Sequence, residues 1–284
     1  MTHDVVADHH YELGEGPVWH TGERRLYWTD ITAGRLLRYD PATGDSECVY
    51  EDDIVSSVTI QRDGSLLVFM DRGRVGHWRD GEMETVVTVV DSATRFNDTI
   101  VDPVGRVFCG TMPDEDSGGS LYRLDRDGTF AEIESDVAIP NGMGFTPDRQ
   151  HCYFTETDAE TIYCYDYDEA TGELTDRQPI VRTDDKPGSP DGMTVDSEGC
   201  LWSAQWQGGC VVRYDPDGAE LARYELPARE TTSVTFGGSA LDELYVTSGG
   251  GDDRPDSGAH AGALFRVCPG VSGVTEFHSE ISLD

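Results

Sequence analysis

Six polar side chains occupy the same position of a repeated sequence pattern, immediately before a short apolar run. They are Glu15, Ser57, Asn97, Asn141, Asp191 and Ser233. Two of the six are carboxylates and two are amides, and unpaired carboxylates brought together are costly. A divalent cation removes that cost, and all-oxygen ligands suit hard ions. We therefore predict one divalent cation, Ca²⁺, Mg²⁺ or Mn²⁺, with Zn²⁺ the less favoured ion.

A purely structural interpretation stands beside this one. Asn-Gly and Asp-Gly dipeptides are common in turns, so Asn141-Gly142 or Asp191-Gly192 alone says little. Four oxygen ligands at one repeat position favour the metal interpretation.

The repeats themselves indicate the elements that would position these residues. The period is about 40 to 50 residues, and each unit contains several short strands rich in aromatic and β-branched residues. Asp-rich turns such as 40–44, 125–128 and 215–218 separate the strands. Helical periodicity is absent. We predict an all-β, six-bladed β-propeller with four antiparallel strands per blade, forming a single domain over residues 1–284.

In a propeller the innermost strands line a central channel, so the six repeated positions should form a ring around its axis. The segment from His9 to Glu12 is predicted to close the ring by pairing with the last blade. Insertions at 183–189 and 249–260 are predicted to be loops.

Motifs of other enzyme classes are missing. The chain has no G-x-S-x-G elbow, no H-E-x-x-H, no P-loop and no G-x-G-x-x-G. Its eight histidines are scattered rather than set at metal-ligand spacings.

The net charge is extreme. The chain carries 55 acidic and 21 basic residues, for a net charge of −34, and Lys186 is its one lysine. Nucleic acid is excluded as a partner, because phosphate contacts need basic patches. Acidic residues spread along the chain favour adaptation to high salt, where repulsion is screened. A cationic partner is the alternative.

The lack of a recognisable targeting signal and the pattern of cysteines both favour the cytoplasm. No run is long and apolar enough for a membrane helix, and residues 1–10 have no basic or apolar leader character. We expect no membrane association. The seven cysteines contain no C-x-x-C and are expected to be buried free thiols.

At several of these segments the sequence resembles the regucalcin/gluconolactonase family of sugar lactonases, which are six-bladed propellers. The resemblance covers roughly residues 13–281. The segments that carry it are 14–19, 95–98, 101–106, 110–112, 139–142, 190–193, 199–202 and 233–238.

The resemblance implies a set of site residues. The metal ligands would be Glu15, Asn141 and Asp191, and the substrate-binding residues Arg95, Asn97 and Glu115. Asp191 would also be the general base. The chain departs from the family at Thr99, where glycine is commoner, and in the acidic loop at 114–118. These departures bear on substrate range.

The implied activity is metal-dependent hydrolysis of a sugar aldonolactone, either a pentonolactone or gluconolactone, to the aldonic acid. The small-molecule partner would then be a sugar lactone. The alternatives are a non-catalytic calcium- or ligand-binding propeller, and a hydrolase of non-sugar lactones or organophosphates. The sequence leaves the oligomeric state open.

Overall fold

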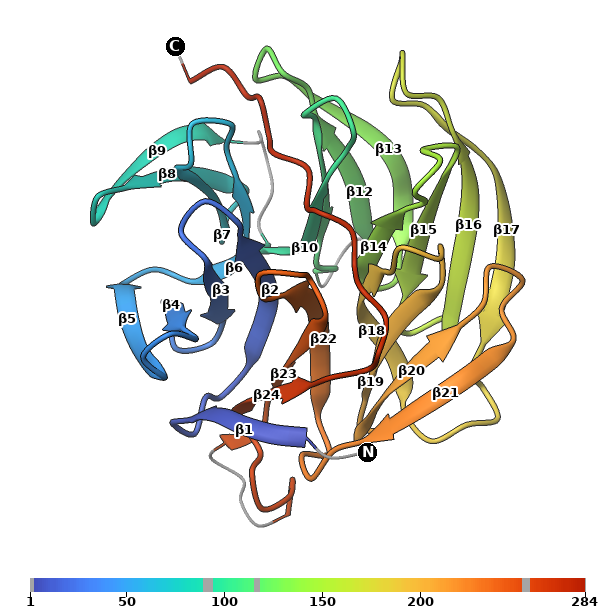
Figure 1. Cartoon of the computed structure of the whole chain (residues 1–284). Coiled ribbons are helices and arrows are strands. Elements are labelled where there is room, and N and C mark those ends of the chain that lie inside the picture. Colours follow the sequence, from blue (N-terminus) through green and yellow to red (C-terminus); the bar gives the residue numbers. More distant parts are fainter. Residues whose placement is uncertain (1–2, 89–93, 115–117, 252–255, 284) are drawn as a thin grey trace.

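The computed structural model describes residues 3–88, 94–114, 118–251 and 256–283. Within these ranges the strands form six separate four-stranded sheets, arranged around a common axis (Figure 1). This is the predicted six-bladed β-propeller. Neighbouring strands within each blade pair antiparallel, as in the pairs β2–β3 and β14–β15.

Five blades follow the chain order, and the sixth combines both ends of the chain. Their strands are β2(Gly14–His20), β3(Arg25–Asp30), β4(Arg35–Asp40) and β5(Asp45–Glu51); β6(Val55–Ile60), β7(Leu66–Met70), β8(Arg74–Arg79) and β9(Glu82–Thr88); β10(Phe96–Val101), β11(Val107–Thr111), β12(Gly119–Leu124) and β13(Phe130–Val137); β14(Pro140–Phe145), β15(His151–Glu156), β16(Thr161–Tyr167) and β17(Leu174–Arg182); β18(Ser189–Val195), β19(Leu201–Trp206), β20(Cys210–Tyr214) and β21(Glu220–Glu225); and β22(Thr231–Gly237), β23(Glu243–Ser248), β24(Ala263–Val267) and β1(His3–Asp8).

Ring closure takes place one segment earlier than predicted. Residues 3–8 form β1 and pair with β24, whereas the expected closing segment His9–Glu12 follows that strand. His10 has a φ of 59°, which ends the extended conformation. Tyr11 still donates its backbone N–H to the carbonyl of Gly262 at 3.0 Å. The predicted segment therefore contacts the last blade, but not as its fourth strand.

Apolar contacts between adjacent blades form the core. One buried cluster joins the first two blades and includes Tyr27 and Val68, and another joins the last two and includes Trp202 and Phe236. The Trp202 and Phe236 rings meet edge to face, with centroids 5.6 Å apart. Since each blade packs against a neighbour on both faces, its middle strands are buried along nearly their whole length, as β7 and β23 show.

The C-terminal segment after β24 crosses one face of the ring (Figure 1). Its backbone hydrogen-bonds to Ser197 through Ser272, to Ile60 through Ser279 and to Gly105 through Glu280. These bonds tie three different blades together across the axis.

Two further sequence expectations can be compared with the structure. All seven cysteines are free, and Cys109, Cys152, Cys200 and Cys210 are buried as predicted. Cys164 is half-buried, and Cys48 and Cys268 are exposed, since Cys48 lies in the outermost strand β5 and Cys268 follows β24. Among the described residues there is no helix with the length and apolar character that a membrane span requires.

Candidate functional site

The inner strand of every blade is irregular where the predicted ring residues lie. Register shifts occur in β2 between Glu15 and Val18, in β14 between Pro140 and Met143, and in β18 between Pro190 and Met193. The same interruption is present in β6, β10 and β22. A β-bulge re-aims side chains and frees them from the alternation of the sheet. Each strand can therefore place a polar residue at the ring and apolar residues further along.

The three predicted metal ligands are buried despite their polarity. Glu15 is 7% exposed, Asn141 5% and Asp191 4%. Among the hydrogen bonds of the described residues, Asn141 Oδ1 and Asp191 Oδ1 have no partner. Buried oxygens without partners are rare because they lose their hydration without compensation. Two such oxygens, in neighbouring blades, are suitable donors for a cation.

The electrostatics show that the acidic groups converge. Burial raises the pKa of Asp191 well above its usual value, and the neighbouring carboxyls of Glu15 and Asp98 raise it further. Burial is also the main cause of a raised pKa at Glu15, with Asp98 contributing next. Glu15 and Asp191 come from blades far apart in sequence, yet the Glu15 carboxyl lies close enough to raise the pKa of Asp191.

Asp98 is the site residue that the sequence interpretation missed. Asp98 lines a cavity on the propeller axis, and burial raises the pKa of its carboxyl while Arg95 opposes the rise. The repeat pattern assigned the ring position in this blade to Asn97. The bulge between Phe96 and Thr99 leaves both Asn97 and Asp98 outside the regular ladder, so both can serve the site. The dipeptide Asn97-Asp98 was the available signal.

Arg95 and Asn97, the predicted substrate-binding residues, form a polar pair beside these carboxyls. Arg95 Nη1 donates to Asn97 Oδ1 at 2.7 Å and to the Phe96 carbonyl at 2.9 Å. Asn97 Nδ2 donates to the Pro140 carbonyl at 2.9 Å. No bond from Nε or Nη2 of Arg95 appears among the described residues, which leaves three N–H donors for another partner. The third predicted substrate residue, Glu115, lies outside the described residues.

Glycines beside the ligands allow neighbouring blades to approach closely. A Cβ on Gly142 would lie 2.6 Å from the carbonyl oxygen of Asp191, and a Cβ on Gly192 would overlap Ser233 of the next blade. Both glycines lie within strands, β14 and β18. The turn interpretation of Asn-Gly and Asp-Gly is therefore wrong here: the glycines are needed for close approach.

The axial cavity continues below this ring. It has a volume of about 80 Å³ and is lined by the inner strands of the blades, with residues 274–277 of the C-terminal segment at its far end. Glu276 lies there, and burial raises the pKa of its carboxyl. The C-terminal segment thus closes the cavity on the face that it crosses.

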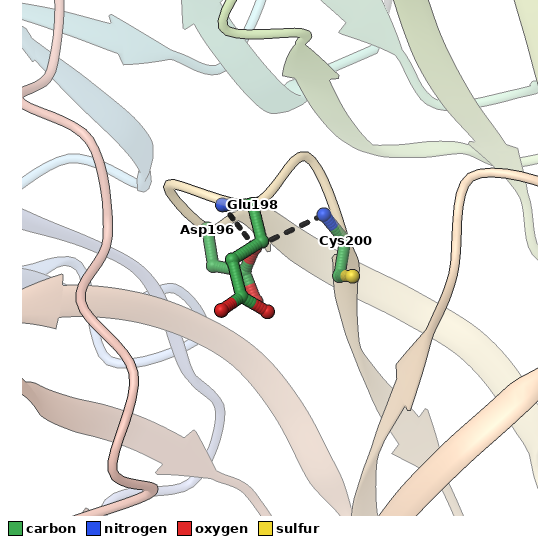
Figure 2. Close-up of side chains that lie close together, drawn as sticks. All are labelled: Asp196, Glu198 and Cys200. Atoms are coloured by element: carbon green, nitrogen blue, oxygen red, sulfur yellow. Dashed lines mark hydrogen bonds between the residues drawn. The ribbon is translucent and has the colours of Figure 1, made fainter.

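A second acidic cluster, Asp196, Glu198 and Cys200, has its ligand atoms close together (Figure 2). Asp196 Oδ1 accepts the backbone N–H groups of Glu198 and Cys200, and Oδ2 accepts Trp202 Nε1 at 2.9 Å. Arg213 completes the shell of Oδ2 at 2.8 Å. Both carboxylate oxygens of Asp196 therefore have hydrogen-bond partners, whereas Asp191 Oδ1 has none among the described residues.

The same turn recurs in another blade, which explains the cluster. Asp102 Oδ1 accepts the backbone N–H groups of Val104 and Arg106, and its Oδ2 accepts Arg106 Nε and the Tyr167 hydroxyl. A repeated Asp that organises the turn between the first two strands of a blade is a structural feature. We assign no metal to it.

Comparisons with known proteins agree with the geometry. Residues 13–250 match the family model described as "SMP-30/Gluconolactonase/LRE-like region". The chain is 56% identical to a pentonolactonase of Haloferax volcanii, with 100% of both chains covered. It is 34% identical to chicken (Gallus gallus) regucalcin, over 96% of this chain and 97% of that protein.

Solved structures give the same result. A luciferin-regenerating enzyme superposes with a TM-score of 0.90 at 30% identity, covering 99% of both chains. A calcium-binding regucalcin from Agrobacterium tumefaciens also reaches 0.90, at 28% identity and 96% coverage of both chains. The propeller, its ring of buried polar side chains and these relatives lead to one assignment: the chain belongs to the SMP-30/gluconolactonase/LRE-like family.

Proposed function

We propose that this protein is a sugar lactonase that hydrolyses a pentonolactone to the open-chain aldonic acid, using one divalent cation held by Glu15, Asn141 and Asp191. The observation that carries the proposal is the pair of buried, unpartnered oxygens on Asn141 and Asp191, beside Glu15. The pentonolactonase of Haloferax volcanii, 56% identical along the full chain, supports the substrate class.

The residues fit such an ion. Two carboxylates and one amide offer hard oxygen donors, which suit Ca²⁺, Mg²⁺ or Mn²⁺. When bound, the cation polarises the lactone carbonyl and stabilises negative charge on its oxygen.

Asp191 would act as the general base. Its carboxylate accepts a proton from the attacking water, whose oxygen bonds to the carbonyl carbon of the lactone. The bond between that carbon and the ring oxygen then breaks, and the ring oxygen leaves as a hydroxyl after taking up a proton. The products are the aldonic acid and, at neutral pH, a released proton.

Arg95 and Asn97 would hold the hydroxyl groups of the sugar. The guanidinium of Arg95 is fixed by its own bonds to Phe96 and Asn97, so its remaining donors point in a defined direction. Glu115 remains part of this proposed substrate set.

The charge of −34 supports a setting of high salt, and the free cysteines support the cytoplasm.

The test is a lactonase assay under metal exchange. Proton release from xylono-, arabinono- and gluconolactone would be followed at molar KCl and near-neutral pH, with correction for spontaneous opening. EDTA-stripped protein should be inactive, and Mn²⁺, Mg²⁺ or Ca²⁺ should restore turnover, with pentonolactones preferred. Metal binding without turnover of any lactone would favour a non-catalytic calcium-binding propeller. The similarity to regucalcins is the reason to consider this alternative.

A further inference from the structure

The hydroxyl of Thr157 lies between two of the proposed metal ligands. Thr157 follows β15 in the fourth blade and is 7% exposed. Asn141 Nδ2 donates to Thr157 Oγ1 at 3.0 Å, and Thr157 Oγ1 donates to the Pro190 carbonyl at 2.8 Å. Pro190 immediately precedes Asp191 in the fifth blade. One hydroxyl therefore connects the Asn141 side chain to the peptide that carries Asp191.

The direction of these bonds determines how Asn141 is oriented. A hydroxyl has a single hydrogen, and the Pro190 carbonyl can only accept it. Toward Asn141 the Thr157 oxygen must then be the acceptor, so the amide has to present Nδ2. Asn141 Oδ1 consequently points away from Thr157, and it is the oxygen that lacks a partner. The hydroxyl thus holds the amide in the orientation that a cation requires.

The same kind of bond recurs at other blade interfaces. Thr29 Oγ1 donates to the Ser56 carbonyl at 3.0 Å, and Thr232 Oγ1 donates to the Gly14 carbonyl at 2.6 Å. Asn97 Nδ2 reaches Pro140 in the same way. In each case the accepting carbonyl directly precedes a ring residue of the next blade. Thr157 differs because its hydroxyl also binds a ligand side chain.

We propose that Thr157 is a positioning residue that joins the ligands Asn141 and Asp191 and thereby sets the affinity of the site for its cation. The inference rests on the proposed function, since it assumes that these residues bind a metal. Partners behind the ligands orient them, and removing such a partner typically lowers metal affinity about 10- to 100-fold.

The test is metal binding by Thr157→Val, which keeps the shape of the side chain and removes the hydroxyl. Binding of Mn²⁺ to EDTA-stripped, dialysed protein at molar KCl would be measured by the electron paramagnetic resonance signal of the free ion. We expect the Kd to rise at least about tenfold. Thr157→Ser should restore wild-type affinity, because it restores the hydroxyl.

Thr161→Val is the matched control. Thr161 is 1% exposed in the same blade, and its hydroxyl donates to the Ala159 carbonyl at 2.7 Å without touching a ligand. This variant should bind Mn²⁺ as the wild type does, even if its melting temperature in EDTA falls. Thr157→Ala provides a second variant should the valine protein fail to fold.

The outcomes separate the two proposals. Wild-type affinity in a folded Thr157→Val or Thr157→Ala protein overturns the positioning role and leaves the lactonase proposal standing. Absence of Mn²⁺, Mg²⁺ and Ca²⁺ binding by the wild type overturns the metal site and the positioning role together. Equal loss of affinity in Thr161→Val would show a general effect of destabilisation and also overturn the inference.

Discussion

Asp191 is the residue on which most of the proposed chemistry depends. The carboxyls of Glu15, Asp98 and Asp191 lie around Arg95, so three potential negative charges face one positive charge. The excess of two negative charges equals the charge of one divalent cation. This balance explains why such groups can be buried together, since without a cation burial and mutual repulsion keep their pKa values raised.

Asp191→Asn should lower kcat about 10²- to 10⁴-fold, because the general base is lost. Circular dichroism and the melting temperature should stay close to those of the wild type. Initial rates on a pentonolactone at saturating metal would measure the effect. Asp217→Asn, at an exposed turn, is the control. Turnover near the wild-type value in the Asp191 variant would rule out this role.

Arg95→Lys should act mainly on substrate binding. Lysine keeps the positive charge but loses the planar set of donors, so KM should rise about tenfold while kcat changes less. A full rate profile against lactone concentration separates the two constants. An unchanged KM would mean that Arg95 holds Asn97 and the carboxyls rather than the sugar.

At the scale of the strand, the bulges and their glycines form the site. In a regular strand, successive side chains point to opposite faces of the sheet, and in a propeller both faces pack against neighbouring blades. The bulge in each inner strand instead presents a polar residue at the ring, and Gly142 and Gly192 let the next blade come close. The distances between ligands of different blades are therefore set by backbone contact.

Gly192→Ala should disturb both stability and activity. The added Cβ would overlap Ser233 Oγ, and overpacking of this kind costs about 1 to 3 kcal/mol. Because Gly192 follows Asp191 directly, the shift should also weaken Mn²⁺ binding. Chemical denaturation and metal titration would be compared with those of Gly22→Ala, at an exposed turn. Wild-type stability and Mn²⁺ affinity in Gly192→Ala would mean that the two blades can move apart to admit the added Cβ without loss of free energy.

At the scale of the whole molecule, the C-terminal segment covers one end of the axial cavity and places Glu276 there. Burial raises the pKa of Glu276, with a hydrogen bond from Thr235 opposing the rise. The folded state therefore keeps a proton that the unfolded chain releases near the ordinary glutamate pKa. The contribution of Glu276 to stability is full below that pKa and is lost as the pH rises through the raised value.

Glu276→Gln should remove this pH dependence. The difference in unfolding free energy between the variant and the wild type should shift in favour of the variant as the pH rises from about 4.5, the ordinary glutamate value, toward neutrality. Denaturation at several pH values in molar KCl measures it. Glu225→Gln, an exposed group, should show no such trend. A constant difference for Glu276→Gln would show that its carboxyl is solvated.

The net charge of −34 belongs to the molecule as a whole. Raising KCl from about 0.1 M to about 1 M shortens the screening length from about 10 Å to about 3 Å and should raise the unfolding free energy. Urea denaturation across that range measures the change. Equal stability at both concentrations would mean that self-repulsion contributes little to the folding balance.

The sequence by itself determined the repeat and the propeller class, because both follow from short patterns recurring along the chain. The family followed from the resemblance that particular segments carry. The sequence also identified Glu15, Asn141, Asp191 and Asn97, since each occupies a recognisable place in the recurring patterns. Local periodicity and residue chemistry were enough for the ring positions. Arg95 and the proposed roles of these residues came from the resemblance to the family.

Only the tertiary structure decided how these residues meet. Asp98 enters the candidate site through a bulge, and Thr157 connects the proposed ligands Asn141 and Asp191, which are 50 residues apart in sequence. The tertiary structure also showed that Asp196 accepts hydrogen bonds from Trp202 and Arg213, whereas Asp191 Oδ1 has no hydrogen-bond partner among the described residues. Whether a buried oxygen has a hydrogen-bond partner depends on segments of the chain that the fold brings together from different blades. A local sequence pattern does not show which segments these are.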